Sequence, residues 1–300
     1  MIKDSYPHVG LGRICRLLGL TRQAYYKNIR YQRKTIAEEH ITLQMISAIR
    51  KDHPRMGGRK LYFMIKEDIN RLHIKVGRDA LFDLLASEHL LVQRRKRKHI
   101  TTNSNHWYRK YPNLIKNIVP DGPNQIWVSD ITYIKTKQEF LYLFLITDAY
   151  SKKILGYRLT KSLDSIHAVN SLQDAIKNNC QPISGLIHHS DRGIQYCCKD
   201  YTDLLNQYSI SISMTEHGDP LENPIAERIN GILKDEYLNN IINVHSHLDK
   251  RDLYNAIEKY NTLRPHLSCD MLTPEEAHRG RGNLRRLWKN YYKKRVNLEV

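Results

Sequence analysis

The sequence predicts an α/β protein in which a basic, all-helical segment precedes a mixed sheet flanked by helices. Up to about residue 93 the apolar residues recur at helical spacing, whereas from residue 124 three strand-like segments follow one another and then alternate with helices. Positive charge is concentrated in the first part, because residues 1–120 hold 25 Lys and Arg against 9 Asp and Glu, and residues 121–240 hold 11 against 15.

Composition excludes several classes of protein. With 300 residues, 41% of them hydrophobic, the chain is long enough for two or three folded domains. We expect no signal peptide, and the longest apolar run, residues 140–147, is too short to cross a membrane. The five cysteines show no CxxC spacing, so they predict neither a disulfide framework nor a zinc site. We therefore expect a cytoplasmic protein.

The uneven charge indicates a polyanionic partner. Residues 241–300 hold 12 basic and 7 acidic side chains, so the basic excess lies mainly in the N-terminal region. If the charged side chains served only solubility, we would not expect basic residues to dominate one part of the chain and acidic residues another. We expect residues 1–98 to bind nucleic acid.

Residues 10–30 have the pattern of a helix-turn-helix. An apolar stripe that ends at Gly19 predicts the first helix, and Thr21 is a suitable N-cap for a second, short polar helix. In this motif the second helix contacts DNA. The side chains predicted to do so are Arg22, Gln23 and Lys27.

A second helical block is expected over residues 38–93, with breaks at Pro54, Gly57-Gly58 and near Gly77. Five consecutive cationic residues follow this helical block. Because no protein core could hold five adjacent charges, we expect them to contact the DNA backbone. These cations are Arg94, Arg95, Lys96, Arg97 and Lys98. Residues 99–121 are polar and contain two prolines, which predicts a linker.

The remaining segments predict the sheet and its helices. Three consecutive strands followed by alternating helices and strands favour a mixed sheet with helices on both faces. Asn223 and Pro224 are expected to open a long helix, with Asn223 as N-cap. The predicted strands cover residues 125–136, 139–151, 152–160, 183–191 and part of 210–222, and the helices cover 162–179, 199–209 and 223–238.

Three acidic residues lie in unusual contexts. Asp130 interrupts the apolar first strand, Asp191 follows the fourth strand, and Glu227 lies in the first turns of the last helix. Each alone has an ordinary explanation as a backbone cap, a turn residue or a partner of the helix dipole. Together they suit Mg²⁺, which compensates clustered carboxylates. Two such ions about 3.5–4 Å apart would promote phosphodiester chemistry.

Other polar residues compete for the same role. Asp148 ends the second strand and is a candidate for lining the cleft, while Glu222 precedes the helix and Glu236 is out of register with Glu227 on it. His188 and His189 lack the paired spacing of a zinc site, so we interpret them as strand-end or DNA-proximal residues.

The acids are separated by 61 and then 36 positions, and this spacing resembles that of DDE transposases with a retroviral-integrase-like core. Nearly the whole chain is similar to the second-frame transposases of the insertion-sequence-three family. The motifs that carry the resemblance are VGLGRICRLLGLTRQAYYK at 9–27, LLVQRRKRK at 90–98, WVSDITYI at 127–134, TDAYSKKILGY at 147–157, HHSDRGIQY at 188–196, ENPIAERINGILKDE at 222–236 and YNTLRPHLSCDMLTPEEA at 260–277.

The resemblance implies a ribonuclease-H-like core with a five-stranded mixed sheet, over residues 122–280, followed by a basic tail at 281–300. It implies that Asp130, Asp191 and Glu227 bind two Mg²⁺ ions, for which Mn²⁺ can substitute, and that Lys234 lies near the DNA end. The 260–277 motif would serve packing or DNA contact.

The activity implied is strand cleavage and strand transfer at the terminal inverted repeats of an insertion sequence, without a covalent protein–DNA intermediate. The implied partners are double-stranded DNA, further copies of the chain on paired ends, and an upstream-frame protein, separate or fused by frameshifting. The setting would be the bacterial cytoplasm, at the nucleoid.

Two alternatives stay open on sequence grounds. One is a non-catalytic DNA-binding protein that acts as a repressor. The other is a structure-specific nuclease such as a Holliday-junction resolvase, which shares the core but would not need the long basic N-terminal region.

Overall fold

The computed structural model describes residues 7–93, 107–116, 118–179, 181–216 and 222–287. The chain divides into two compact units, of which the first comprises residues 1–51 and 56–93 and the second residues 52–55 and 94–300. The predicted basic run at 94–98 and most of the predicted tail lie outside the described residues.

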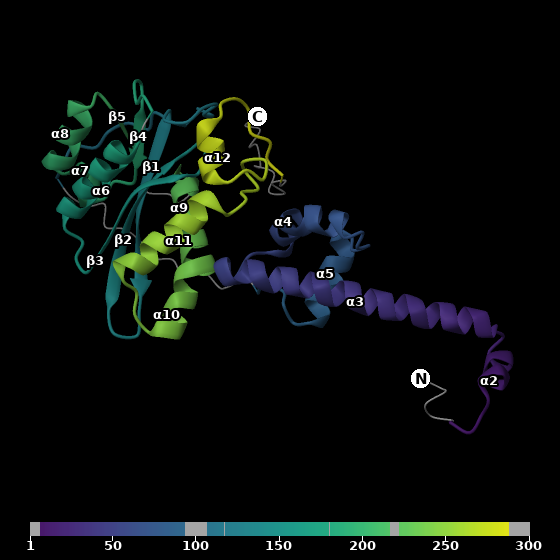
Figure 1. The fold of residues 1–300 in the computed structure, drawn as a ribbon. Helices are drawn as coiled ribbons and strands as arrows, with labels where there is room; N and C mark the ends of the chain where they lie inside the picture. The colour runs from purple at the N-terminus through teal and green to yellow at the C-terminus, as the bar shows by residue number, and fades with distance from the viewer. Residues whose placement is uncertain (1–6, 94–106, 117, 180, 217–221, 288–300) are drawn as a thin grey trace, which may run out of the picture. The chain divides into compact units, whose positions relative to one another are not determined.

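The first unit is all-helical (Figure 1). Its core is formed by apolar side chains of the last three helices and the turns between them, among them Ile46, Leu61, Ile65, Leu81 and Leu85. The helices are α2 (Leu11–Leu17), α3 (Arg22–Asp52), α4 (Gly58–Arg71) and α5 (Arg78–Ser87).

The helix after the predicted turn is not short. Thr21 accepts a hydrogen bond from the Ala24 amide at 3.0 Å, as a capping residue should. However, α3 then continues without interruption to Asp52, because no Gly or Pro occurs before Pro54 to stop it. The expected short helix and the start of the expected second block are therefore one helix.

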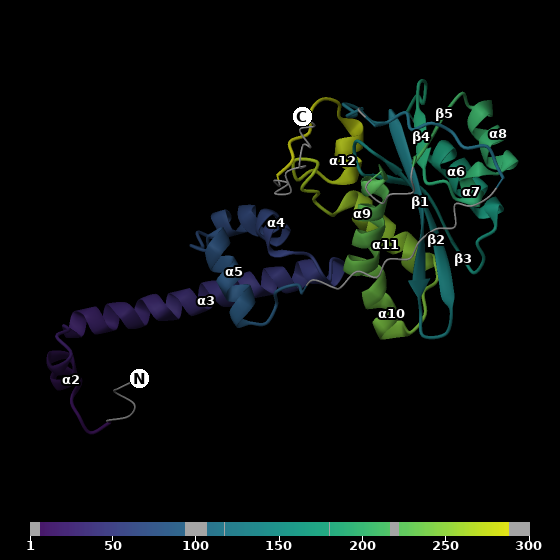
Figure 2. The same ribbon diagram turned by 180° about the vertical axis from the view of Figure 1, so that it is seen from behind.

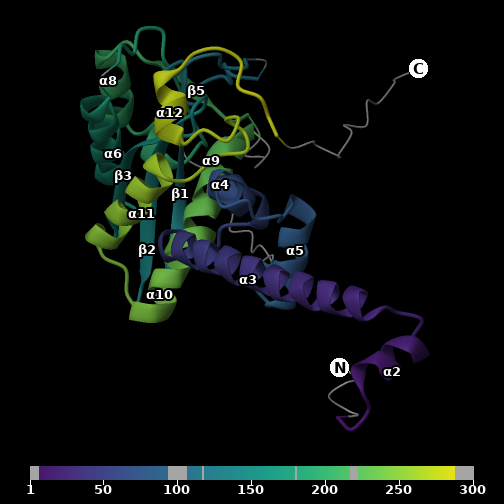
Figure 3. The ribbon, with the colours of Figure 1, turned by 45° about the vertical axis from the view of Figure 1, so that its right-hand side comes forward.

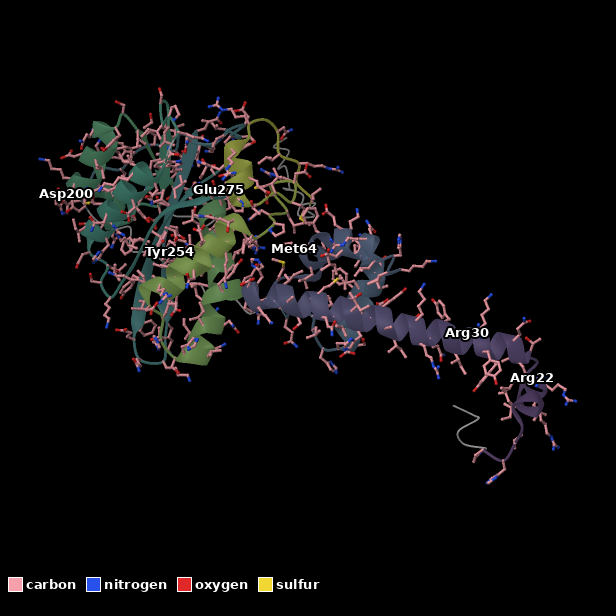
Figure 4. All side chains as sticks on the ribbon, in the orientation of Figure 1. Arg22, Arg30, Met64, Asp200, Tyr254 and Glu275 are labelled. Carbon is pink, nitrogen blue, oxygen red and sulfur yellow. The ribbon has the colours of Figure 1, made fainter. Side chains whose placement is uncertain are left out.

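The predicted DNA-contacting residues lie on the exposed N-terminal part of α3. Figure 4 shows the side chains of Arg22 and Arg30 extending away from the helix, and both are exposed. Gln23 and Lys27 are exposed as well.

The second unit contains the predicted five-stranded mixed sheet. Its order is β3-β2-β1-β4-β5, with β1, β2 and β3 antiparallel and β1, β4 and β5 parallel. This confirms the predicted fold class. The strands are β1 (Ile126–Lys135), β2 (Phe140–Asp148), β3 (Ile154–Thr160), β4 (Ile187–Ser190) and β5 (Ser211–Met214).

Helices cover both faces of this sheet (Figures 2 and 3). On one face lie α6 (Ser165–Asn178), α7 (Ile194–Cys197) and α8 (Lys199–Gln207), which pack with Trp127, Phe144 and Ile146. On the other lie α9 (Pro224–Ile232), the π-helix η2 (Leu233–Leu238), α10 (Asn239–His245) and α11 (Lys250–Thr262), which pack with Leu143 and Leu145. The last helix is α12 (Pro274–Arg279).

The long helix expected after Asn223 differs from the prediction in two ways. Its middle is a π-helix, which α-helical periodicity does not predict. In addition, Asn223 makes no side-chain cap; its side-chain amide instead donates to the Ser129 carbonyl at 2.9 Å. Asn223 therefore attaches the start of α9 to β1.

The described residues of the 260–277 motif hold the second unit together. Asn261 donates to the Ile154 carbonyl and accepts from the Ile154 amide, at 2.9 and 3.0 Å. Buried Arg264 makes two hydrogen bonds of 2.7 Å to Glu236 in η2. These contacts are packing interactions, one of the two roles considered for this motif.

We predict that Gly156→Ala destabilises the second unit by about 3 kcal/mol. A Cβ at residue 156 would lie 2.1 Å from the Ser171 carbonyl oxygen and 2.9 Å from Ala175 of α6. Gly231→Ala, in α9, is the control, since a Cβ there meets nothing within 4 Å and alanine favours the helix by about 0.5–1 kcal/mol. Urea unfolding measures both, and equal stability of the two variants would contradict the prediction.

Candidate active site

The parallel pairing of β1 with β4 aligns two of the predicted acids. Ile126 pairs with Ile187 and Val128 with His189, a constant offset of 61 positions. Continued by two residues, the same register places Asp130 level with Asp191. The Asp130 carboxylate faces α9, from which Asn230 donates to it, and Asp191 lies level with it directly after β4.

Glu227 reaches this location from α9. The buried side chains of Ala226, Ile229 and Ile232 fix that helix on the sheet, and Ala226 packs against Ile126 and Val128. Glu227 is exposed at the start of the helix and is close enough to Asp130 to act on its ionisation. The structure thus brings the three predicted acids into one electrostatic neighbourhood.

The ionisation of Asp130 reflects this crowding. Burial, followed by the negative charges of Asp191 and Glu227, raises the pKa of Asp130 to about 7. Two hydrogen bonds act in the opposite direction, from the Ile131 amide at 2.9 Å and the Asn230 side-chain amide at 2.7 Å. A cation bound here would remove the electrostatic cost of ionising this carboxyl.

Asp191 is held by the turn that follows it. Its Oδ1 accepts a hydrogen bond from the Gly193 amide at 3.0 Å. A Cβ on Gly193 would lie 3.0 Å from the same oxygen, so glycine leaves space for the carboxylate. The second residue after the aspartate thus fixes its orientation.

Asn230 is a site residue that the sequence analysis missed. It lies three residues after Glu227, on the neighbouring turn of α9, and is 4% exposed. Its amide nitrogen donates to Asp130 Oδ2, while its Oδ1 is buried and makes no hydrogen bond among the described residues. Its position three residues after Glu227, on the same face of the helix, is the feature of the sequence that could have predicted its place in the site.

Lys234 also lies near the acids. Burial lowers the pKa of its ammonium group, and the negative charge of Asp130 acts in the opposite direction. The side chain is partly buried within η2, not freely solvated. Lys234 is thus close enough to Asp130 for the two charges to interact.

The two histidines before Asp191 are structural. Both are buried, so the interpretation as DNA-proximal residues is wrong and the strand position is correct. His188 Nε2 lies 2.6 Å from Ser129 Oγ and 2.8 Å from the Tyr201 hydroxyl. Burial and the neighbouring His189 lower the pKa of His188 to about 3, which keeps the ring neutral. This network joins β1, β4 and α8.

The competing acids have structural partners. Asp148 does not lie beside the other acids, because antiparallel β2 ends beside Trp127, three positions before Asp130 on β1, whereas Asp130 itself pairs with Leu145. Burial raises its pKa, but hydrogen bonds from His278 and Ser151 outweigh this and lower it. Glu222 Oε2 accepts from the Glu216 amide at 2.7 Å.

The donor set fits a hard divalent cation. It consists of carboxylate oxygens, with the buried amide oxygen of Asn230 close to that of Asp130, and burial disfavours the charged form of Asp130. The three acids are more widely spaced than a closed metal cage. Among the described residues, ligand atoms within 4.8 Å of one another occur in His247, Asp249 and Asp252. There the two aspartates already form the capping box of α11.

Comparison with known proteins identifies the family. The family models described as "Integrase core domain" match residues 120–220 and 208–274. The "Insertion element IS600 uncharacterized 31 kDa protein" of Shigella sonnei is 31% identical, over 87% of this chain and 96% of its own length. The chain belongs to the insertion-sequence-three family of DDE transposases. It is therefore a polynucleotidyl transferase that acts on DNA, and its role is DNA transposition by an insertion element.

Further relatives of this transposase are similar over most of its length. The "Transposase InsF for insertion sequence IS3A" of Escherichia coli strain K12 is 25% identical over 92% of this chain and 96% of its own. The "Transposase for insertion sequence element IS629" of Shigella sonnei is 29% identical over 78% of both chains. Among solved structures, the HTLV-2 integrase catalytic core domain in complex with magnesium is 23% identical, with a TM-score of 0.44, over 52% of this chain and 97% of that one.

The described helices of the transposase include none that is both long and apolar enough to cross a membrane.

We predict that Asp130→Asn raises the melting temperature of the metal-free transposase at pH 8 by about 3 °C. The pKa of Asp130 is raised from 3.8 to about 7. The wild-type protein therefore loses stability as pH rises through this interval, because the unfolded chain ionises first. The gain in the variant should be smaller at pH 5. Thermal unfolding in EDTA measures it.

Asp148→Asn is the matched control with the opposite sign. The lowered pKa of Asp148 contributes stability above the ordinary pKa of 3.8, and this contribution is lost only as pH falls below that value. This variant should therefore melt lower than the wild type at both pH values. If the stabilisation by Asp130→Asn did not increase with pH, burial and charge repulsion would not be what raises the pKa of Asp130.

Proposed function

We propose that this transposase cleaves DNA at the terminal inverted repeats of its insertion sequence and transfers the resulting 3′ ends to target DNA, using divalent metal ions held by Asp130, Asp191 and Glu227. The observation that carries the proposal is the β1–β4 register, which sets Asp130 level with Asp191 below the start of α9. The double-stranded DNA of the repeats and of the target would be the substrates.

We expect two Mg²⁺ ions, for which Mn²⁺ can substitute. They would activate the attacking oxygen and stabilise the leaving oxygen. The remaining work falls to the chain itself. The Ile131 amide and Asn230 orient Asp130, and the Gly193 amide orients Asp191. Lys234 would bind a phosphate next to the scissile bond. Water would attack first, and the released 3′-hydroxyl second.

The rest of the proposal concerns partners and setting. The exposed cations at the start of α3 and the run at 94–98 would bind the repeats, with Arg22, Gln23 and Lys27 contacting the DNA. We further propose that copies of the chain pair two DNA ends and that an upstream-frame protein, separate or fused, contributes to assembly. The work would take place in the bacterial cytoplasm, at the nucleoid.

The cleavage prediction is tested with a labelled duplex that carries the terminal repeat. Alanine at residue 130, 191 or 227 should lower the rate of metal-dependent nicking at the repeat end by at least about a thousandfold. Asp200→Asn, an exposed acid on α8 labelled in Figure 4, is the control and should leave the rate unchanged.

The assay is run with Mg²⁺, with Mn²⁺ and with EDTA, and with and without the upstream-frame protein. DNA binding without cleavage in every condition would contradict the enzymatic role and favour a repressor. Cleavage that follows branched structure and not the repeat sequence would favour a resolvase.

The basic run at 94–98 should contribute to the salt dependence of DNA binding. Replacing all five cations with Gln should reduce the slope of log K against log salt by up to about 4.5, because each phosphate contact releases about 0.9 counterion. Lys177→Gln, an exposed lysine of α6, is the control and should leave the slope unchanged. Fluorescence anisotropy across a salt series measures it, and an unchanged slope in the five-fold variant would remove the run from the interface.

A further inference from the structure

Residues 107–111, Trp-Tyr-Arg-Lys-Tyr, interleave aromatic and cationic side chains within the stretch predicted to be a linker. The ring of Trp107 stacks on that of Tyr108, with the centroids 4.3 Å apart and the planes inclined by 24°. The Arg109 guanidinium lies over the Tyr111 ring, 5.0 Å from its centroid. We call residues 107–111 the aromatic segment.

The aromatic segment is fixed on the catalytic core. Tyr108 and Tyr111 pack against the apolar cluster under α6, α7 and α8. The chain that follows lies along the edge strand β5, where the Met214 amide donates to the Pro112 carbonyl at 3.3 Å and the Leu114 amide to Ser213 Oγ at 2.9 Å. The rings are therefore attached to a rigid sheet.

Trp107 is unusual for its exposure. Its side chain is 86% exposed, although it is stacked on a neighbour, whereas Trp127 in the core is fully buried. A large aromatic ring supported on one face and open on the other is a platform on which another planar ring can stack. Arg109 and Lys110, both exposed, place positive charge beside it.

The aromatic segment lies at the same end of the sheet as the catalytic acids. Its chain joins β5 at Ser213 and Met214, the carboxyl end of that strand, and Asp191 follows the carboxyl end of the neighbouring parallel strand β4. The thiol of Cys197 is close enough to both Asp191 and Lys110 for their charges to affect its ionisation. Burial and then Asp191 raise the pKa of Cys197 to about 11, whereas Lys110 acts to lower it.

We propose that the aromatic segment binds unpaired DNA, with a base stacked on the open face of Trp107 and the adjoining phosphates neutralised by Arg109 and Lys110. Planar side chains alternating with cations are the chemistry that binds single strands without reading their sequence. Double-stranded DNA exposes the face of a base for stacking only at its end or where its two strands separate. The inference rests on the proposed function, in which DNA ends are brought to the acids at this end of the sheet.

The test uses the fluorescence of Trp107 itself in the full-length chain. The chain has three tryptophans, Trp107, buried Trp127 and Trp288, so Trp288→Phe serves as the background. A single-stranded oligodeoxythymidine should quench the emission at micromolar concentrations, and a hairpin-capped duplex, which has no open end, should quench it much less. An oligouridine of the same length tests whether the site prefers RNA.

Substitutions then locate the binding. Trp107→Leu should abolish the quenching and weaken single-strand binding, measured by anisotropy of a labelled oligodeoxythymidine, by about tenfold. Trp107→Tyr should retain most of the affinity because it keeps a stacking surface. Tyr254→Ala removes another exposed aromatic ring, on α11 (Figure 4), and should leave the affinity unchanged.

The outcomes separate this inference from the proposed function. Equal single-strand binding by the wild type and Trp107→Leu, or stronger quenching by oligouridine than by oligodeoxythymidine, would overturn the inference, whether or not the repeat is cleaved. A different outcome is that single strands quench the protein with Trp107 and not Trp107→Leu, while the wild type cleaves the repeat duplex under no condition. That outcome would support the inference and overturn the proposed function.

Discussion

The candidate site depends on the parallel pairing of β1 with β4. Carboxylates repel one another, so an unfolded chain would not bring Asp130 and Asp191 together. The backbone hydrogen bonds of the two strands impose the register, and the buried contacts of His188 with Ser129 and Tyr201 secure it on the face opposite α9. The resulting repulsion remains as the raised pKa of Asp130, and it is the physical reason why a cation would bind there.

The third acid depends on a separate set of contacts. Apolar packing of α9 on the sheet and the hydrogen bond from Asn223 to the Ser129 carbonyl fix the start of the helix, where Glu227 lies. Further along, the widened turns of η2 present Glu236 to Arg264, and this buried ion pair connects η2 to the segment after α11. Breaking such a pair by removing one partner leaves a buried charge unpaired, so this contact holds η2, which continues α9, in place.

Partner contacts distinguish structural from functional polar residues in the second unit. Asp148 and Glu236 are acidic and close in sequence to the motifs, yet hydrogen bonds and an ion pair compensate each of them within the fold. Asp130, in contrast, faces two further carboxylates, and the residue that donates to it, Asn230, has a buried oxygen without a partner among the described residues. Carboxylates whose charges converge on one location are those whose ionisation a metal ion would favour.

The sequence by itself determined the mixed sheet and the family and predicted the three acids, because strand periodicity and the 61- and 36-residue spacings are local or countable properties of the chain. It did not determine the π-helix, the length of α3, the role of Asn223 or the burial of His188 and His189. Those depend on which side chains meet across the fold: a cap residue such as Asn223 is used elsewhere when a strand carbonyl lies within reach. Asn230 shows the same limit, since its place beside Asp130 follows from the docking of α9 on β1, which only the tertiary structure decided.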